Sequence, residues 1–199
     1  MSRLTRLGVV LSGTGRTLEN LVACIRAGTL PARIACVISD RPGVRGLDIA
    51  RDADLPHYLE PDSARTFEIL REHEVDLVCL CGYLRHFRVE EPFEGRIMNI
   101  HPALLPEFGG QDMHGQVVHQ AVLDSGGRFS GCTVHFVDEE YDHGPIILQR
   151  TCPVLPDDDH ESLAARVFAL ECQAYPEAIR LFAARRLSVN DDRVHILPV

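Results

Sequence analysis

Short segments made almost entirely of apolar residues constrain the fold of this chain most strongly. Three of them occupy residues 7–11, 34–39 and 75–81, and residues with helical apolar spacing lie between them. Unbroken apolar strands are typical of sheets buried on both faces, and strands that alternate with helices form parallel sheets. The first half therefore predicts an open, mostly parallel, twisted α/β sheet with helices on both faces. The predicted helices cover residues 17–27, 47–53 and 66–73.

The second half predicts a mixed sheet. We expect a strand over residues 97–101, a helix over 116–124, and two strands with alternating patterns over 132–137 and 145–151. Residues 138–144 alone separate the last two strands. Seven residues are too few for a helical crossover, so this pair is predicted to be antiparallel.

The C-terminal region predicts one long helix and a small hairpin. Residues 158–161 resemble a capping box, which marks a helix start, and Pro176 is expected to end or kink the helix. The hairpin is expected within residues 187–199, around Asn190 and Asp191.

Size and charge exclude several classes of protein. The 199 residues suit one large domain, and a formal net charge of -9 disfavours a nucleic-acid partner. No uncharged stretch approaches the ~20 apolar residues of a membrane span. The apolar run at residues 7–11 is also too short for a signal peptide, which needs about 7 to 15. We therefore expect a cytoplasmic protein without a membrane partner.

The seven cysteines do not predict a metal site. Their number is odd, and no pair has the CxxC spacing of zinc or thioredoxin-like sites. We interpret them as small buried residues in a reducing compartment.

A glycine-containing turn, residues 12–17, joins the first predicted strand to the first helix. Backbone N–H groups at a helix N-terminus favour a phosphate. Leu18 stands where a dinucleotide fingerprint has its third glycine, so that class is disfavoured. A phosphate cradle and a bare strand-to-helix turn both fit the pattern.

Asn99 and His101 are candidate catalytic residues. Period 2 places them on one face at the carboxyl end of a predicted strand, where open α/β sheets bind ligands. An amide that binds a carbonyl oxygen, beside an imidazole that titrates near neutral pH, suits acyl transfer. A structural histidine that caps a turn is the alternative.

The acidic turn at residues 138–145 offers a carboxylate partner for His101. It lacks the ligand spacing of a calcium loop. Asp142, beside Gly144, is the candidate to fold back onto His101, raise its pKa and orient it. His135 is expected to be structural or to support the site.

Five motifs in a fixed order carry a family resemblance. They lie at residues 12–15, 82–85, 99–106, 134–137 and 142–146. Together they resemble the folate-dependent phosphoribosylglycinamide formyltransferases over residues 7–184. The resemblance implies a Rossmann-like formyltransferase domain over 1–199, with a nucleotide- and phosphate-binding half (1–100) and a folate and catalytic half (101–199).

The resemblance also implies an activity. Family members transfer a formyl group from 10-formyltetrahydrofolate, a co-substrate, to the amine of glycinamide ribonucleotide in purine biosynthesis, and no metal is required. His101 would be the general acid and Asn99 would bind the formyl oxygen. Asp142 would raise the pKa of His101 and order a water that relays protons.

Binding residues follow from the same resemblance, with a monomer or homodimer as the assembly. The implied substrate-binding residues are Gly15, Arg16, Thr17 and Glu171. The implied folate-binding residues are Arg65, Leu84, Arg85, His86, Phe87, Asn99, Val137 and Tyr141.

Two segments depart from the family pattern. His143 stands where the family often has glycine, beside Asp142. Residues 108–115 form a longer glycine-rich segment, which we interpret either as a flexible lid over the substrate or as a passive surface loop.

Three other functions remain open at this stage. A formyltetrahydrofolate deformylase-like hydrolase shares the Asn, His and Asp set, but we expect no room before Leu7 for its regulatory domain. A formyltransferase for another amine would be expected to carry a further C-terminal domain. A non-catalytic folate-binding module is the third alternative.

Overall fold

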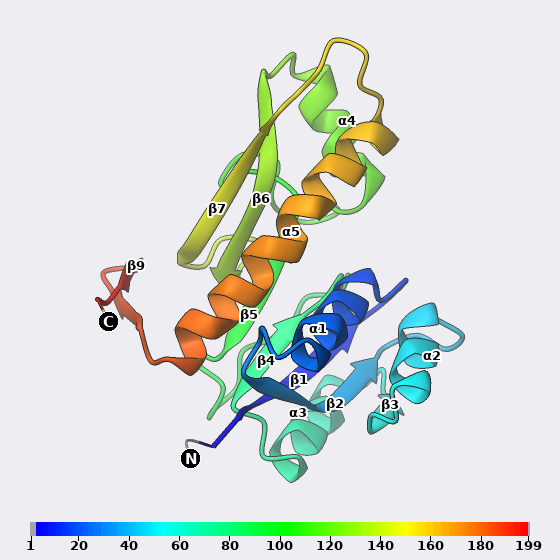
Figure 1. Ribbon diagram of the computed structural model, residues 1–199, viewed down its shortest axis with the longest axis vertical. Helices are drawn as coiled ribbons and strands as arrows, with labels where there is room; N and C mark the ends of the chain where they lie inside the picture. Colours follow the sequence, from blue (N-terminus) through cyan, green and yellow to red (C-terminus); the bar gives the residue numbers. More distant parts are fainter. Residues whose placement is uncertain (1–2, 199) are drawn as a thin grey trace. The chain divides into compact units, whose positions relative to one another are not determined.

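The structure is a computed structural model that describes residues 3–198. The chain divides into two compact units, one up to Met98 and one from Asn99 onward. Figure 1 traces the elements of each unit from the N-terminus to the C-terminus.

The first unit contains a parallel sheet. Its strands are β1 (Thr5–Leu11), β2 (Ala32–Ser39), β3 (His57–Leu59) and β4 (Leu77–Leu80), and its helices are α1 (Arg16–Arg26), α2 (Arg45–Asp52) and α3 (Ser63–Glu72). The strands lie in the order β3-β2-β1-β4, and each neighbouring pair is parallel. All four residues of β4 are buried, as are all residues of β1 after Thr5. The predicted parallel sheet of unbroken apolar strands is confirmed.

Strand β3 was missed by the sequence analysis. It has only three residues, two of them exposed, and it pairs at the edge of the sheet with β2. Its residues therefore carry neither an apolar run nor a clear alternation, which are the two signals of a strand.

The second unit contains the antiparallel pair. Its elements are β5 (Ile97–His101), which begins just before the unit boundary, α4 (Gln116–Asp124), β6 (Phe129–Phe136), β7 (Ile146–Pro153), α5 (His160–Ala183), β8 (Leu187–Asn190) and β9 (Arg193–Ile196). The order is β5-β6-β7, and β6 and β7 are antiparallel, as predicted. Helix α5 packs along β6 and β7 and against α4 (Figure 1). Strands β8 and β9 form the predicted hairpin.

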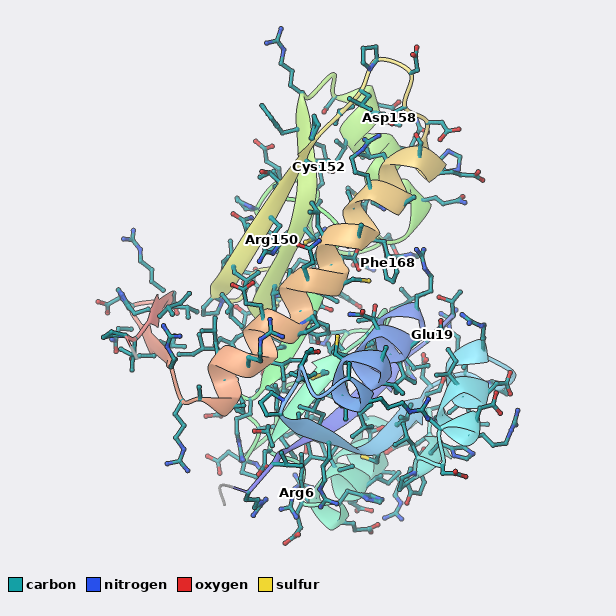
Figure 2. All side chains as sticks on the ribbon, viewed as in Figure 1. Arg6, Glu19, Arg150, Cys152, Asp158 and Phe168 are labelled. Atoms are coloured by element: carbon teal, nitrogen blue, oxygen red, sulfur yellow. The ribbon has the colours of Figure 1, made fainter. Side chains whose placement is uncertain are left out.

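The capping box of α5 is real but was placed one residue too early. Asp159 is the N-cap, and it exchanges hydrogen bonds with Ser162 at the third helical position. Asp158 instead forms a two-bond ion pair with Arg166, at 2.6 and 2.8 Å. Figure 2 labels Asp158 at the N-terminal end of this helix. Two adjacent aspartates made the register ambiguous in the sequence.

Pro176 does not end α5, which continues to Ala183. Proline removes one N–H donor from a helix interior and normally weakens it. Here Tyr175, Ala178 and Ile179 are completely buried, so packing on both sides of the proline holds the helix. Tertiary packing thus overrides the local signal.

All seven cysteines are free thiols, and five are buried. Burial raises the pKa of Cys36 and of Cys132 to about 12, so both remain protonated and unreactive near neutral pH. Within residues 3–198, no helix combines the length and apolar character that crossing a membrane requires.

Candidate active site

Asn99 and His101 lie at the carboxyl end of β5, two residues apart on one face, as predicted. Asn99 is half-buried, whereas His101 is 3% exposed. Both ring nitrogens of His101 face acceptors. Nε2 lies 2.8 Å from the carbonyl oxygen of Phe108, and Nδ1 lies 3.3 Å from Oδ2 of Asp142.

Asp142 is the residue that joins the cluster. Its carboxylate accepts hydrogen bonds from Asn99 Nδ2 at 3.2 Å and from the backbone N–H of Gly110 at 3.1 Å, in addition to its contact with His101. The structure thus brings together the three residues that the sequence analysis selected, from β5 and from the turn between β6 and β7.

His135 joins the same cluster. Its Nδ1 lies 2.8 Å from the Phe136 carbonyl, which can only accept, so we assign the proton to Nδ1. Its Nε2 can then accept from Asn99 Nδ2 at 3.2 Å, and it lies 3.6 Å from Asp142 Oδ1. His135 therefore orients the side-chain amide of Asn99: the amide nitrogen, and not the amide oxygen, must face the accepting Nε2 of His135.

The pKa of His101 differs from expectation. Burial lowers the pKa of His101, and this outweighs the opposing effects of Asp142 and of the Phe108 carbonyl. Asp142 does act in the predicted direction, but the net shift is downward. The sequence could not show this because burial of His101 depends on segments distant along the chain.

The carboxyl group of Asp142 stays ionised. Burial raises the pKa of Asp142, but the adjacent His135 and His101 rings and the Gly110 N–H together lower it below its usual value. Asp142 is thus an ionised carboxylate next to the mainly neutral imidazole of His101. The imidazole can accept one proton, because the protonated ring can donate hydrogen bonds to both Asp142 and the Phe108 carbonyl.

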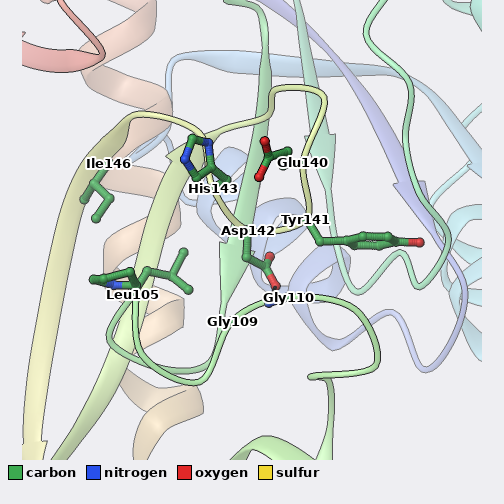
Figure 3. Close-up of a pocket in the computed structure, with 9 residues that line it drawn as sticks. Leu105, Gly109, Gly110, Glu140, Tyr141, Asp142, His143 and Ile146 are labelled. Carbon is green, nitrogen blue, oxygen red and sulfur yellow. Dashed lines mark hydrogen bonds between the residues drawn. The ribbon is translucent and has the colours of Figure 1, made fainter.

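A pocket of about 200 Å³ opens beside this cluster. Figure 3 shows Asp142 next to Gly110, with Glu140 and His143 on the same turn and Tyr141 directed away from Asp142. The lining residues are Leu105, Pro106, Gly109, Gly110, Glu140, Tyr141, Asp142, His143 and Ile146. A reactant in this pocket would lie against the carboxylate.

The glycine-rich segment 108–115 contacts the cluster of candidate catalytic residues. The Phe108 carbonyl meets His101, and the Gly110 N–H meets Asp142. A Cβ on Gly109 would lie 2.5 Å from Leu105, so this glycine is needed for close packing. The interpretation as a passive surface loop is therefore incomplete, because two of its backbone groups are partners of catalytic candidates.

Thr133 supports the chain that follows β5. Its hydroxyl donates to the Ala103 carbonyl at 2.7 Å and accepts the Leu105 N–H at 3.0 Å. These bonds fix the residues after His101 to the buried face of β6. Thr133 lies two residues before His135, so the two side chains share a face of the strand, but the sequence does not indicate their partners.

His119, on α4, is a site residue that the sequence analysis missed. It is 5% exposed, and its Nδ1 has no hydrogen-bond partner within the described residues. Burial, with smaller effects of His101 and His160, lowers the pKa of His119 to about 4. A lone histidine in a helix gives no sequence signal of this proximity to His101.

The predicted phosphate turn lies in the first unit, between β1 and α1. Gly15 is the N-cap of α1 with φ of +71°, and a Cβ there would lie 2.6 Å from the Cα of Gly46. The Gly46 N–H also donates to the Gly13 carbonyl at 3.1 Å. Only glycine fits at position 15, since both the left-handed φ and the close backbone contact exclude a side chain.

The same turn is bonded to the segment after β4. The Ser12 N–H donates to the Gly82 carbonyl, and the Ser12 hydroxyl accepts the Leu84 N–H, each at 3.1 Å.

Of the other phosphate candidates, Arg16 is exposed and Thr17 is half-buried, both in the first turn of α1.

The folate candidates of the first unit are in varied environments. Arg65 is exposed on α3 and pairs with Glu68 and Glu72. Arg85 donates to the Pro61 carbonyl at 2.6 Å. The ring of Phe87 is buried against Phe67 and Tyr83, so its side chain belongs to the core. Leu84 is half-buried and His86 is exposed.

The candidates of the second unit are partly accessible. Val137 is half-buried at the start of the acidic turn, and Tyr141 is 38% exposed. Glu171 is half-buried on α5 and close enough to Cys132 to affect its pKa. Across residues 3–198, no group of three or more His, Cys, Asp or Glu residues is arranged to hold a metal ion.

The fold and the cluster define an α/β protein whose amide, imidazole and carboxylate suit acyl transfer. The chain belongs to the formyl transferase family, which it matches over residues 5–179. It is 34% identical to phosphoribosylglycinamide formyltransferase of Haemophilus influenzae, over 97% of this chain and 94% of that protein. It is 38% identical to the chloroplastic phosphoribosylglycinamide formyltransferase of Vigna unguiculata, over 98% of this chain but only 66% of that protein.

Solved structures agree with this assignment. Glycinamide ribonucleotide transformylase 1 from Symbiobacterium toebii superposes with a TM-score of 0.91 at 41% identity, covering 100% of this chain and 96% of that one. The predicted Rossmann-like formyltransferase fold is confirmed. A formyltetrahydrofolate deformylase from Pseudomonas syringae shares the fold, with a TM-score of 0.86 at 24% identity, over 99% of this chain and 67% of that one.

Proposed function

We propose that this chain transfers the formyl group of 10-formyltetrahydrofolate to the amine of glycinamide ribonucleotide, giving formylglycinamide ribonucleotide and tetrahydrofolate. The observation that carries the proposal is the cluster of Asn99, His101 and Asp142 beside a pocket, in a chain of the formyl transferase family. The names of relatives at 34–41% identity over nearly the whole chain support the choice of acceptor.

The chemistry needs an oxyanion site and a proton carrier. Attack of the amine on the formyl carbon places negative charge on the formyl oxygen, which the Asn99 amide can stabilise by redirecting to it one of the two N–H groups that it donates to Asp142 and His135. His101 takes up a proton as the amine loses one and donates it to N10 of the folate as the C–N10 bond breaks. Its lowered pKa suits the first of these steps, and Asp142 stabilises the protonated ring in the second.

Binding roles belong to the same proposal. Gly15, Arg16 and Thr17 hold the substrate phosphate at the start of α1, and Glu171 contacts the ribonucleotide. The folate contacts Leu84, Arg85, His86 and Phe87, the last through its backbone, together with Val137 and Tyr141, and Arg65 meets its glutamate tail. A cytoplasmic location and a monomer or homodimer remain predictions.

The test is absorbance-monitored release of tetrahydrofolate from a 10-formylfolate donor, with and without glycinamide ribonucleotide. We expect release that depends on the ribonucleotide. Equal release without it would establish a hydrolase, the activity named for the deformylase neighbour. No release in either case would refute formyl transfer to this acceptor and favour another amine or a binding module.

A further inference from the structure

The turn that carries Asp142 is closed by its own ion pair. His143 Nδ1 donates to Asp138 Oδ2 at 2.8 Å, and the other oxygen of Asp138 accepts the Glu140 N–H at 2.9 Å. One carboxylate therefore ties two points of the turn together, on either side of Tyr141. We call this pair of contacts the Asp138–His143 clasp.

Asp142 needs such support because its backbone is strained. Its φ of +54° lies in the left-handed region, which is unfavourable for a residue with a side chain. The next tie along the chain is at Gly144, where a Cβ would lie 2.1 Å from the Phe136 carbonyl. Asp142 therefore sits between the clasp and a position that admits only glycine.

Charge makes the clasp dependent on pH. The charged groups that act on His143 are Asp138, Glu140 and, from the β8–β9 hairpin, Asp192, and all three are acidic. The hydrogen bond that His143 donates to Asp138 is the largest cause, and the pKa of His143 is raised above 6.5. The clasp is a charge-assisted bond below that pKa and a weaker neutral bond above it.

We propose that His143 is a positioning residue for the catalytic carboxylate: protonated and bonded to Asp138, it holds the strained turn in which Asp142 meets His101 and Asn99. The residue was singled out by sequence as a departure from its family, and the structure shows its partner. This inference rests on the proposed function for its kinetic test, but the clasp itself can be observed without turnover.

The kinetic test compares wild type with His143→Ala, His143→Gln and Asp138→Asn from about pH 6 to pH 9. We expect His143→Ala to lower kcat about two- to fivefold near pH 6, the size of one solvent-exposed ion pair. KM for the folate donor should change little. The ratio of wild-type to His143→Ala kcat should fall toward one as pH rises through the pKa of His143.

Two variants separate the charge from the side chain's volume. His143→Gln can donate to Asp138 without a charge, so its kcat should lie between those of wild type and His143→Ala at low pH. The double variant His143→Ala/Asp138→Asn should be no worse than either single variant, since both remove one contact. His57→Ala, an exposed histidine on β3, is the matched control, and thermal unfolding confirms that each variant is folded.

A ratio of one at every pH would overturn the proposal. A ratio above one that does not change with pH would show a structural role without the cation, and a change confined to KM would show a donor contact; both outcomes contradict positioning by the clasp. NMR titration of the imidazole C–H resonances provides the independent readout. Asp138→Asn should lower the pKa of His143, and an unchanged pKa would refute the clasp even if the wild-type protein has no transferase activity.

Discussion

The turn after β1 and the cluster after β5 both follow the carboxyl end of a strand, but they are built from different groups. The turn consists of backbone, with Gly15 as the N-cap and contact to Gly46. The cluster consists of side chains, in which Asn99, His101 and His135 surround Asp142. A backbone site is damaged by adding atoms, whereas a side-chain site is damaged by removing them.

Removing the imidazole of His101 should have the largest effect. His101→Ala is expected to lower kcat about 10²- to 10⁴-fold, the usual contribution of a positioned acid–base group. KM for glycinamide ribonucleotide should change little, because the proposed phosphate contacts lie in the turn after β1. Steady-state kinetics on both substrates measure this.

The pH profile of the wild-type protein sharpens the same prediction. Since burial lowers the pKa of His101, the neutral ring that accepts a proton should persist below pH 6.5, and kcat/KM should decline only at more acidic pH. A decline centred above pH 6.5 would show that Asp142 outweighs burial and that His101 enters the reaction protonated.

The sequence predicts the turn after β1 and the cluster after β5 to different extents. The strand, turn and helix around Gly15 are local, so residues 7–27 were sufficient to predict them. The meeting of His101 and Asp142 is not local, yet two motifs and a family resemblance indicated it. His119 and the net pKa of His101 were missed, because both depend on burial by segments that no local pattern connects.

The same reasoning explains the errors in the fold. Strand β3 is too short and too exposed to show a period, and Pro176 is a strong local signal that packing overrides. The presence of a capping box was predicted correctly, but adjacent Asp158 and Asp159 offered two registers and the wrong one was chosen. A prediction from a local sequence pattern is wrong where contacts with another part of the chain determine the structure.

His119 is a buried histidine of the second unit, and it should make the stability of the protein sensitive to acid. The pKa of His119 is about 4 in the folded protein and near 6.5 in an unfolded chain. The unfolded state therefore binds more protons between these values, so stability is highest above pH 6.5 and is lost as pH falls toward 4. The loss attributable to His119 is at most about 3 kcal/mol.

His119→Gln tests this loss because glutamine is polar, similar in size and does not titrate. The variant's free energy of unfolding, from urea denaturation between pH 7 and about pH 4, should fall less steeply than that of wild type. The matched control is His195→Gln, which changes an exposed histidine on β9. Parallel pH profiles for wild type and His119→Gln would contradict a buried, neutral His119.

Adding one methyl group should break the backbone site with the smallest of these effects. Gly15→Ala places a Cβ 2.6 Å from the Cα of Gly46 and forces a left-handed φ on alanine, so the turn must shift. We expect KM for glycinamide ribonucleotide to rise about tenfold, the loss of roughly one phosphate hydrogen bond. The kcat at saturating substrate should stay within about twofold, because the cluster after β5 is untouched.

Gly13→Ala is the matched control for this change. It adds the same methyl group to the same turn, but a Cβ there meets nothing within 4 Å, and Gly13 has no positive φ. Its KM should remain that of wild type. Equal increases in KM for both variants would show that the turn responds to any loss of glycine flexibility. An unchanged KM for both variants would refute the proposal that this turn binds the phosphate. Only an increase in KM for Gly15→Ala without one for Gly13→Ala supports a phosphate site built from backbone groups at a fixed position. The cluster around Asp142 differs from such a site because it is built from side chains.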